Sequence, residues 1–367
     1  MDYLELAKTV GILTGISGGL ALLMSIAQNT IGNYGEKEIT INGEKKLIMD
    51  GGDTLLAGLI DNEVFLPSAC GGKGTCGYCK CKVLSGGGQL LATETGLVTP
   101  EEAAEGIRLS CQLKVKEDIQ IEIPQEYLDL KQWETVAYRI DDVTPTIKRV
   151  FLRLPEGEEI NFKPGQYVQI LAPEYQGNDE EVYRAYSIAS SPSKKDEIEL
   201  LIGYIPEGIA TTYVHQHLKE GDTLNIIGPF GHFFYQDTDK PMIFVGSGTG
   251  IAPNLSILRY MQENDIQRPG IFLSAGRKIE DLPMKEEIDA IAADLPNIKM
   301  IWSVTGADPG TWDGPTEWVT DGLKKLVDDA KDSEAYLCGS PVTIEQIVDV
   351  LTEKGMTEDE IFYDKFQ

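Results

Sequence analysis

The sequence predicts a multidomain chain that combines α+β and α/β architecture behind an N-terminal transmembrane helix. Three observations predict this fold class. An uncharged run extends from Thr9 to Gly35, four of the six cysteines lie in a glycine-rich loop between Cys70 and Cys81, and the last third alternates strand-like and helix-like segments. The length agrees, because 367 residues suffice for two or three domains with separate cores.

Composition limits the classes of partner. The apolar content of 42 % and the charged content of 25 % are ordinary for globular protein. The net charge of −27 argues against nucleic acid and against electrostatic docking on anionic lipid. It leaves either a well-solvated acidic surface or an acidic face that steers a basic redox partner. With three histidines and no HExxH or paired-His spacing, a zinc or non-haem iron centre is not expected.

The uncharged run near the start predicts the transmembrane helix. Its segment VGILTGISGGLALLMSIA is apolar enough to cross a bilayer once. A cleaved signal peptide is the competing interpretation, but the start MDYLELAK is acidic and no small-x-small cleavage site follows. Lys37, Lys45 and Lys46 follow the run and only Lys8 precedes it. We therefore expect residues 1–35 to be a single-pass anchor in the inner or plasma membrane, with the remaining domains in the cytoplasm.

The anchor also carries a stripe of small residues. Gly11, Gly15 and Gly19 recur every four residues and so share one helix face. Such a stripe lets a second membrane helix approach closely, although glycine is common in lone anchors as well. Both interpretations, a membrane partner and a lone anchor, stay open here.

The cysteine spacing favours an iron–sulfur site. Cys70, Cys76 and Cys79 form C-x5-C-x2-C, and Cys111 follows in RLSCQL. Disulfides would require export, and a structural zinc site usually shows two C-x2-C pairs. Three ligands in one loop and a distant fourth are typical of plant-type ferredoxins. Cys81 is left over, and we expect a buried small residue there, with a substitute ligand as the alternative.

The loop CGGKGTCGYC has five residues between its first two cysteines instead of the usual four. It resembles the ferredoxin domain of the F subunit of the Na+-translocating NADH:quinone oxidoreductases. The preceding segment predicts a hairpin centred on Asn42-Gly43 and then a helix, as in β-grasp ferredoxins. For residues 36–125 the resemblance implies a [2Fe–2S] cluster whose ligands are Cys70, Cys76, Cys79 and Cys111.

The middle of the chain predicts an antiparallel β-barrel. YRIDDVTPTIKRVFLRLP and FKPGQYVQILAP alternate apolar and polar residues and are broken by Pro and Gly. The following segment YRAYSIASSP resembles the R-x-Y-[ST] signature of the ferredoxin–NADP+ reductase superfamily. The resemblance implies that Arg184 pairs with a flavin pyrophosphate, Tyr186 stacks on the isoalloxazine and the Ser187 hydroxyl hydrogen-bonds near N5.

A second flavin motif follows in EGIATTYVHQHLKEG. It resembles the superfamily's G-x-x-[ST] element, whose helix turns its N-terminal amides toward the pyrophosphate. These motifs imply FAD in a barrel at residues 133–236, with FMN as the alternative. The residues of this element are Gly208, Ile209, Ala210 and Thr211.

The last third predicts a Rossmann-like domain at residues 237–367. PMIFVGSGTGIAPNLSILRYMQEN runs strand, glycine turn and helix, and IFLSAGR and IKMIWSVTG are further strands. The segment AYLCGSP resembles the superfamily's C-G-x-P strand end, which implies that Cys338 and Gly339 lie beside the nicotinamide; core packing is the other interpretation of Cys338. The turn residues expected to bind the dinucleotide are Gly246, Gly248, Thr249 and Gly250.

The sequence favours NADH over NADPH. After IWSVTG the chain offers ADPGTWDGPTEW, which is acidic, has no base and would repel a 2′-phosphate. Arg277 is a candidate cofactor contact, although relatives of both specificities carry arginine there. The chain ends IFYDKFQ, and the resemblance implies that Phe366 shields the flavin face. Ser187, Cys338 and Phe366 are thus the expected catalytic residues.

The order of anchor, ferredoxin, FAD barrel and NAD domain resembles that of the F subunit along essentially the whole chain. One departure is LIGYIPEGIATT, where the family has a longer proline-rich insertion. The implied activity is hydride transfer from NADH to FAD and electron transfer to the cluster, as the electron-entry subunit of a Na+-translocating NADH:quinone reductase with other membrane subunits as partners. The alternatives are a stand-alone NADH-dependent reductase that feeds an oxygenase or a corrinoid protein, and a non-catalytic membrane-bound redox sensor or assembly factor.

Overall fold

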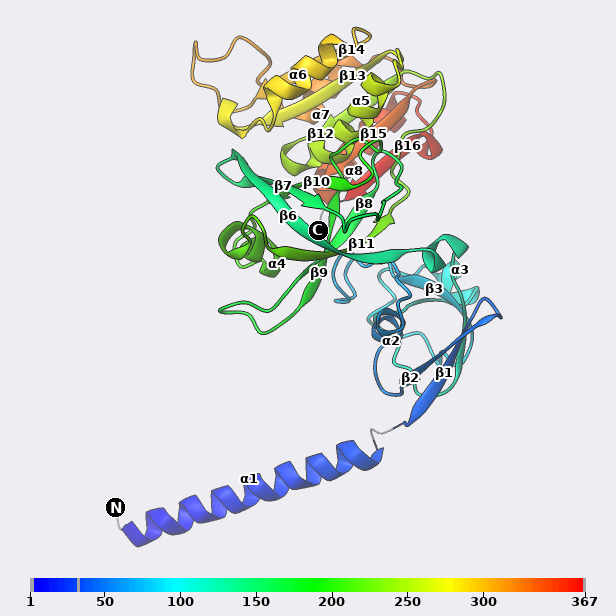
Figure 1. The fold of residues 1–367 in the computed structure, drawn as a ribbon, viewed down its shortest axis with the longest axis vertical. Helices are drawn as coiled ribbons and strands as arrows, with labels where there is room; N and C mark the ends of the chain where they lie inside the picture. The colour runs from blue at the N-terminus through cyan, green and yellow to red at the C-terminus, as the bar shows by residue number, and fades with distance from the viewer. Residues whose placement is uncertain (1–2, 32–33, 366–367) are drawn as a thin grey trace. The chain divides into compact units, whose positions relative to one another are not determined.

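The computed structural model describes residues 3–31 and 34–365. The chain divides into two compact units (Figure 1). The first comprises residues 1–66 with 72–129, and the second comprises residues 67–71 with 130–367. Residues 67–71, which include Cys70, group with the second unit, whereas the rest of the predicted cysteine loop groups with the first.

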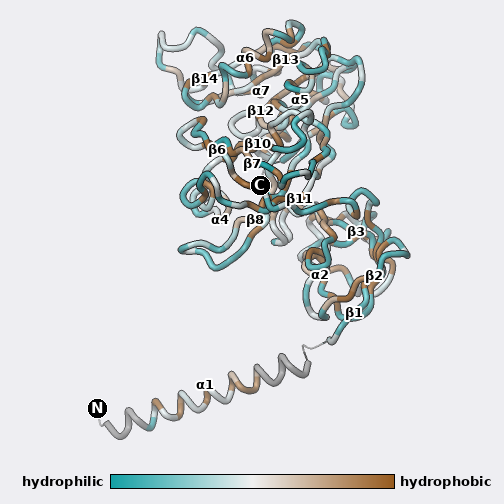
Figure 2. Tube along the Cα trace, in the orientation of Figure 1, coloured by the Kyte–Doolittle hydropathy of each residue, from teal (hydrophilic) through white to brown (hydrophobic). Residues whose placement is uncertain are grey.

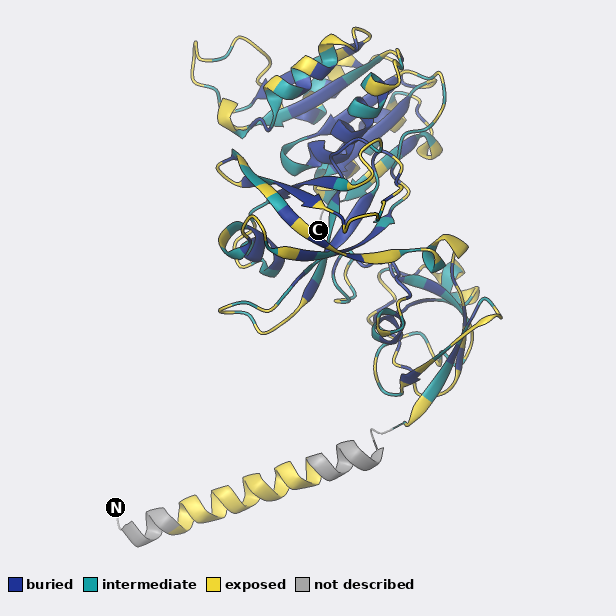
Figure 3. Ribbon diagram, viewed as in Figure 1, coloured by how far each residue is buried: buried dark blue, intermediate teal, exposed yellow. Residues whose placement is uncertain are grey.

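The first unit begins with helix α1 (Tyr3–Ile31), which lies within the predicted anchor at residues 1–35. Apolar residues recur along it (Figure 2), and its side chains from residue 8 to 24 are exposed (Figure 3). Within the described part of the chain, no helix combines the length and the apolar composition that a bilayer crossing requires. The helix predicted from the sequence is therefore present, and its passage through a membrane stays a prediction. The large exposed apolar side chains are Val10, Ile12, Leu13, Ile16, Leu20, Leu22, Leu23 and Met24.

The rest of the first unit is a five-stranded sheet with short helices. Its elements are β1 (Glu36–Ile41), β2 (Lys45–Asp50), α2 (Leu55–Asp61), β3 (Lys80–Ser85), α3 (Pro100–Ala104), β4 (Ile107–Leu109), β5 (Ile119–Glu122) and η1 (Gln125–Leu128). The strand order is β2-β1-β5-β3-β4. Strands β1 and β2 form the predicted hairpin: Ile41 pairs with Lys45, and within the loop between them Asn42 and Gly43 take φ of 52° and 75°. Ile39 and Ile41 of β1 point into a core with Leu55 and Leu59 of α2.

The second unit contains the predicted antiparallel barrel. Its strands are β6 (Lys131–Thr144), β7 (Ile147–Arg153), β8 (Tyr167–Ala172), β9 (Val182–Ser187), β10 (Glu197–Gly203) and β11 (Thr223–Phe230), and α4 (Ile209–Thr212) with η2 (Tyr213–His217) lies between β10 and β11. The order is β10-β7-β6-β11-β8-β9, and every pair is antiparallel. An isolated bridge between Ile188 and Leu200 joins the two outer strands. The sheet therefore curls round a core that includes Val150, Ile170 and Ile226.

A parallel sheet in the order β14-β13-β12-β15-β16 completes the second unit. Its elements are β12 (Met242–Gly246), η3 (Gly248–Ile251), α5 (Ala252–Glu263), β13 (Gly270–Gly276), η4 (Ile279–Asp281), α6 (Lys285–Ala293), β14 (Ile298–Val304), α7 (Val319–Leu326), β15 (Glu334–Gly339), α8 (Pro341–Glu353), η5 (Glu358–Glu360) and β16 (Ile361–Lys365). Phe244 packs with α5 and α6, whereas Val245 packs with α7 and α8. Because neighbouring residues of a strand face opposite sides, helices cover both faces, as the Rossmann-like prediction required.

Candidate redox cofactor sites

The glycine turn after β12 has the shape that a dinucleotide needs. A Cβ on Gly246 would lie 2.3 Å from the carbonyl oxygen of Gly250, and a Cβ on Gly250 would lie 2.5 Å from that of Cys338. These two glycines therefore let the turn close on itself and on the end of β15. At Gly248, where φ is +58°, nothing lies within 4 Å of the Cβ position. A phosphate can approach the backbone there, so the turn, which includes half-buried Thr249, fits NADH.

Cys338 lies at the carboxyl end of β15 and pairs with Gly246 on one side and Asp364 of β16 on the other. Only 3 % of its surface is exposed. Burial, with a smaller contribution from Asp364, raises the pKa of the Cys338 thiol, so the thiol is neutral. Asp364 is half-buried, and desolvation of its carboxyl raises its pKa to about 7. No atom lies within 4 Å of a Cβ placed on Gly339, which leaves room beside the thiol.

Two further predicted contacts have different outcomes. Arg277 is exposed directly after β13, and its carbonyl accepts from the amide of Gly306 at 2.9 Å. It therefore lies at the edge of the sheet where parallel strands end, together with the acidic loop that carries exposed Asp308 and Asp313. Phe366 lies outside the described residues, so its predicted stacking on the flavin stays a prediction.

Strand β9 presents the three predicted flavin residues. Ser187 is buried with 4 % exposed, and burial raises the pKa of half-buried Tyr186. The Nη1 of Arg184 donates to the carbonyls of Tyr183 at 2.7 Å and Cys70 at 3.1 Å. The three side chains thus come from one edge strand of the barrel.

An unpartnered donor on the neighbouring strand supports a ligand in the barrel. Gln169 of β8 is 3 % exposed, and its Nε2 has no hydrogen-bond partner in the described part of the protein. It pairs across the sheet with Ala185, inside the R-x-Y-[ST] motif. A buried amide donor usually has a partner, and a flavin carries acceptors that could supply one. The motif analysis missed Gln169, although one polar residue within YVQILA was a visible signal.

The second flavin motif forms the first turn of α4. Gly208 is the N-cap residue, and its carbonyl accepts the first helical bond from Thr212 at 2.8 Å. The amides of Ile209, Ala210 and Thr211 therefore precede the first intrahelical bond, as predicted for a pyrophosphate contact. The Thr211 hydroxyl bonds both the carbonyl and the amide of Ile205, so it also folds the preceding loop.

Two cysteines of the first unit, Cys79 and Cys111, form a hydrogen-bonded pair. Cys79 and Cys111 are buried, and their mutual hydrogen bond, together with burial, raises the pKa of the Cys79 thiol. Cys76 is half-buried. Among the described residues, no three His, Cys, Asp or Glu side chains converge as ligands of a single metal ion. A thiol pair is the donor set that one iron of a [2Fe–2S] cluster takes, so these residues fit that group.

Cys81 and Gln112 complete this region. Cys81 packs in the core beside Cys79, and burial raises its pKa to about 12, which agrees with a packing role. The Nε2 of Gln112 lies 3.5 Å from the Sγ of Cys111, as a donor to sulfur. The sequence reasoning did not single out Gln112, and its place directly after Cys111 was the only signal.

A buried ion pair braces the strand that leads to Cys111. Glu94 is fully buried, and Arg108 of β4 donates to it with Nη2 at 2.6 Å. The same carboxylate accepts from the amides of Leu91 and Leu109, both at 2.9 Å. The pair therefore fixes loop and strand together. Sequence reasoning missed it, although Arg108 opens the segment RLSCQL, because no local pattern links Arg108 to Glu94.

These sites define a class of protein, an iron–sulfur flavoprotein oxidoreductase with three cofactor domains in one chain. Residues 39–116 match the 2Fe-2S iron-sulfur cluster binding domain family. Residues 137–235 match the oxidoreductase FAD-binding domain family, and residues 244–349 match the oxidoreductase NAD-binding domain family. The predicted cofactors FAD, NADH and a [2Fe–2S] cluster are thereby confirmed.

Full-length relatives narrow this class to a family. The chain is 35 % identical to the F subunit of the Na(+)-translocating NADH-quinone reductase of Neisseria meningitidis, over 406 residues that cover 99 % of this chain and 100 % of the relative. Identity to the corresponding protein of Pseudomonas aeruginosa is also 35 %, over 404 residues that cover 99 % and 98 %. The chain therefore belongs to the family of the F subunits of Na+-translocating NADH-quinone reductases, which confirms the resemblance.

Solved structures share the architecture. A cytochrome P450 reductase of Amycolatopsis has a TM-score of 0.73 and 26 % identity, and the match covers 90 % of this chain and 98 % of that one. A ferredoxin reductase in carbazole 1,9a-dioxygenase has a TM-score of 0.70 and 25 % identity, with the same coverage. Both likenesses extend over most of the chain and over nearly all of each reductase.

Proposed function

We propose that this chain is the electron-entry subunit of a Na+-translocating NADH:quinone reductase and passes electrons from NADH through FAD and a [2Fe–2S] cluster to a downstream acceptor. The observation that carries the proposal is the full-length similarity to the F subunits together with the three cofactor-binding families in one chain. The domains we propose are an anchor at residues 1–35, a ferredoxin at 36–125, an FAD barrel at 133–236 and an NAD domain at 237–367.

The chain's own residues bind and orient the cofactors. When bound, FAD supplies conversion between the two-electron chemistry of NADH and the one-electron chemistry of the cluster. Arg184 neutralises the pyrophosphate, Tyr186 offers its ring as a stacking surface, and Ser187 offers a hydroxyl near N5. Cys338, neutral because it is buried, would lie beside a bound nicotinamide without adding charge to the site. No side chain needs to move a proton in that step.

The cluster ligands we propose are Cys70, Cys76, Cys79 and Cys111. The hydrogen-bonded pair of Cys79 and Cys111 supports this set, as does the loop spacing. Gln112 lies 3.5 Å from the Cys111 sulfur, and a donor to a ligand sulfur is one of the ways in which proteins set a cluster's reduction potential.

We further propose that α1 anchors the chain as a single membrane-spanning helix with the cofactor domains in the cytoplasm. Its support is the uncharged run from Thr9 to Gly35, the exposed apolar side chains and the lysines that follow the run. Carbonate washing of native membranes tests this. An anchored chain stays in the pellet and is released only by detergent, whereas a peripheral chain appears in the supernatant.

Mild detergent extraction and a native gel stained for NADH dehydrogenase activity test the assembly. Activity at several times the chain's own 40.4 kDa, with this chain beside multi-span proteins, is the expected result. Activity only near the size of the single chain and its detergent would contradict a role within a larger complex.

A stand-alone reductase is the second candidate function. The two solved reductases that match 90 % of the chain favour it, since one is described as a cytochrome P450 reductase and the other as a ferredoxin reductase in a dioxygenase. The alignment to the Neisseria relative spans 406 positions, more than the 367 residues of this chain, so this chain lacks some of the relative's residues. The single-chain outcome on the native gel would favour this alternative, and purified oxygenases would then be tested as acceptors.

A further inference from the structure

One face of α5 is bonded to the chain segment that follows the flavin strand. Arg259 donates from Nη1 to the carbonyl of Ala189 at 2.6 Å, and Ser256 donates from Oγ to the carbonyl of Ser190 at 2.7 Å. Ser256 is fully buried. Glu263, one turn further along the same face, accepts from the hydroxyl of the next residue in the segment. Three side chains at i, i+3 and i+7 of α5 thus hold three consecutive residues beyond β9.

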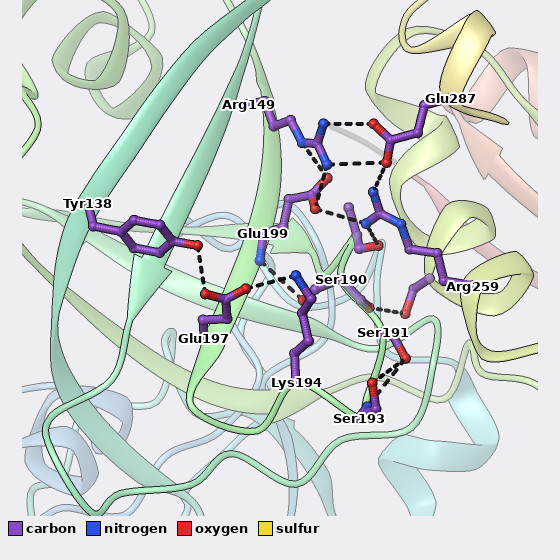
Figure 4. A network of polar contacts seen from close by, with 12 residues as sticks. Tyr138, Arg149, Ser190, Ser191, Ser193, Lys194, Glu197, Glu199, Arg259 and Glu287 are labelled. Atoms are coloured by element: carbon purple, nitrogen blue, oxygen red, sulfur yellow. Dashed lines mark hydrogen bonds and ion pairs between the residues drawn. The ribbon is translucent and has the colours of Figure 1, made fainter. Parts of the chain in front are cut away.

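Arg259 also belongs to a partly buried network of four charges (Figure 4). Its Nη1 lies 2.8 Å from Glu199 of β10, and its Nη2 bonds Glu287 of α6. Arg149 of β7 completes the network, with Nε 2.8 Å from Glu199 and Nη1 2.8 Å from Glu287. The contact between Arg149 Nε and Glu199 is an ion pair without hydrogen-bond geometry. Two guanidinium groups and two carboxylates therefore balance each other.

The network joins the two cofactor domains. Arg149 and Glu199 come from the FAD-binding barrel, whereas Arg259 and Glu287 come from helices of the NAD-binding sheet. Exposure of the Arg149, Glu199 and Arg259 side chains is 16 %, 4 % and 13 %, whereas the Glu287 side chain is 39 % exposed. Removing one partner would leave a buried charge unpaired, so such a network tolerates few relative positions of its elements.

The carboxylate of Glu287 is held in its ionised form. Burial by itself would raise the pKa of Glu287, but the hydrogen bond and charge of Arg259, together with those of Arg149, hold it below its ordinary value. Glu287 lies between the two arginines and accepts from both. We call this charge-balanced network the polar joint; its members are Arg149, Glu199, Arg259 and Glu287. Its geometry, and not a change of protonation, holds the helices of the NAD-binding sheet against the barrel.

The joint lies within a few residues of both proposed cofactor sites. Ala189 is the second residue beyond Ser187, and α5 starts at Ala252, directly after the glycine turn of η3. We propose that Arg259 is a positioning residue for hydride transfer: by locking α5 to the segment beyond β9, it sets the separation and angle between nicotinamide and flavin. This inference rests on the proposed function, because it takes the β9 and η3 residues as the flavin and NADH sites.

Stopped-flow reduction of the bound flavin by NADH tests the proposal in the detergent-solubilised full chain. The test variant is Arg259→Met, which keeps the aliphatic stem, and Arg259→Lys keeps the charge but not the planar fork. Arg139→Met is the matched control, since Arg139 is 57 % exposed and its ion pair with Asp141 lies at the surface. We expect Arg259→Met to lower the reduction rate at saturating NADH by about tenfold or more, because misplacement by an ångström can cost about a hundredfold.

A loosened fold would give a different result. It would lower the amplitude of flavin reduction, by leaving less competent protein, but would not change the rate in the remainder. Mispositioning lowers the rate at full amplitude and changes the rate ratio between NADH and NADH deuterated at C4. Arg259→Lys is expected to lie between the wild type and Arg259→Met, and Arg139→Met to stay within about twofold of wild type.

Two outcomes separate this inference from the proposed function. A wild-type rate and isotope ratio in FAD-loaded Arg259→Met would overturn the positioning role and leave the proposed function standing. Failure of NADH to reduce the wild-type flavin would overturn the proposed function itself. If Arg259→Met does not fold, Ser256→Ala removes only the bond to Ser190, and a rate equal to wild type there would contradict the joint.

Discussion

At the residue scale, Cys338 and Asp364 are the two groups whose neutral forms the fold favours most clearly near the proposed nicotinamide site. They pair across β15 and β16, and each is desolvated. Burial keeps the Cys338 thiol neutral and raises the pKa of the Asp364 carboxyl to about 7, so the pair carries less negative charge than it would in water. The burial that makes Cys338 a packing residue is therefore also what suits it to the site.

The raised pKa of Asp364 makes the folded protein less stable as the pH rises. Its pKa is about 7 in the folded protein and 3.8 ordinarily, so the folded state binds the proton more tightly. The stability it contributes is complete below pH 4 and is lost as the pH rises toward 7. Asp364→Asn removes this loss, so urea unfolding should find the variant more stable relative to wild type at about pH 8 than at about pH 5. An equal difference at both pH values would contradict the raised pKa.

A substitution at Cys76 tests the role of the cluster separately from that of the flavin. Cys76→Ala removes a proposed ligand while leaving the barrel residues unchanged. We expect FAD to remain, the iron–sulfur absorbance to disappear, NADH-to-ferricyanide activity to persist and transfer to the natural acceptor to be lost. Loss of ferricyanide reduction in a variant that still binds FAD would show that electrons do not enter through the flavin.

Arg184 carries the positive charge that we propose pairs with the flavin pyrophosphate. Arg184→Ala removes the charge that pairs with the pyrophosphate, and we expect the purified variant to have lost FAD. Release of flavin on heat denaturation, compared with wild type, measures the bound fraction. Full retention of FAD would refute the assignment of this motif to the flavin site. Arg153→Ala, on the same barrel but 55 % exposed, is the control.

At the element scale, periodicity and turn chemistry predicted well what is local. The hairpin at Asn42-Gly43, the alternating barrel strands and the strand-turn-helix of β12, η3 and α5 all follow from neighbouring residues. Contacts between residues far apart in the chain could not be predicted from neighbouring residues. Arg259 with Glu199, and Arg108 with Glu94, depend on how elements pack, which no local pattern encodes.

The pair of Glu94 and Arg108 is such a contact, and it carries a stability prediction. Glu94→Gln leaves the guanidinium buried without its counter-charge, so we expect a loss of about 3–5 kcal/mol in the free energy of unfolding. Glu122→Gln, in an exposed pair with Lys82, is the control and should cost about 0–1 kcal/mol. Urea unfolding measures both. Equal small losses would mean that β4 is held by other contacts.

At the scale of the whole molecule, the order of domains could be predicted because each cofactor leaves a sequence signature. Cysteine spacing, R-x-Y-S and the glycine turn are short and local, and the domain families bear out the cofactors that they implied. The acceptor beyond the cluster has no such signature, because surfaces that bind partners need no fixed residue spacing. The assembly with other subunits is therefore a proposal, whereas the cofactor content is confirmed by the domain families.

The most direct test of the electron path is an anaerobic titration of the purified full-length chain with NADH, followed by optical absorbance and electron paramagnetic resonance. We predict bleaching of the flavin together with the appearance of a reduced [2Fe–2S] signal, and in Cys76→Ala the bleaching alone. Flavin bleaching in the wild type with no cluster signal at any excess of NADH, although iron is bound, would contradict the proposed path from NADH through FAD to the cluster.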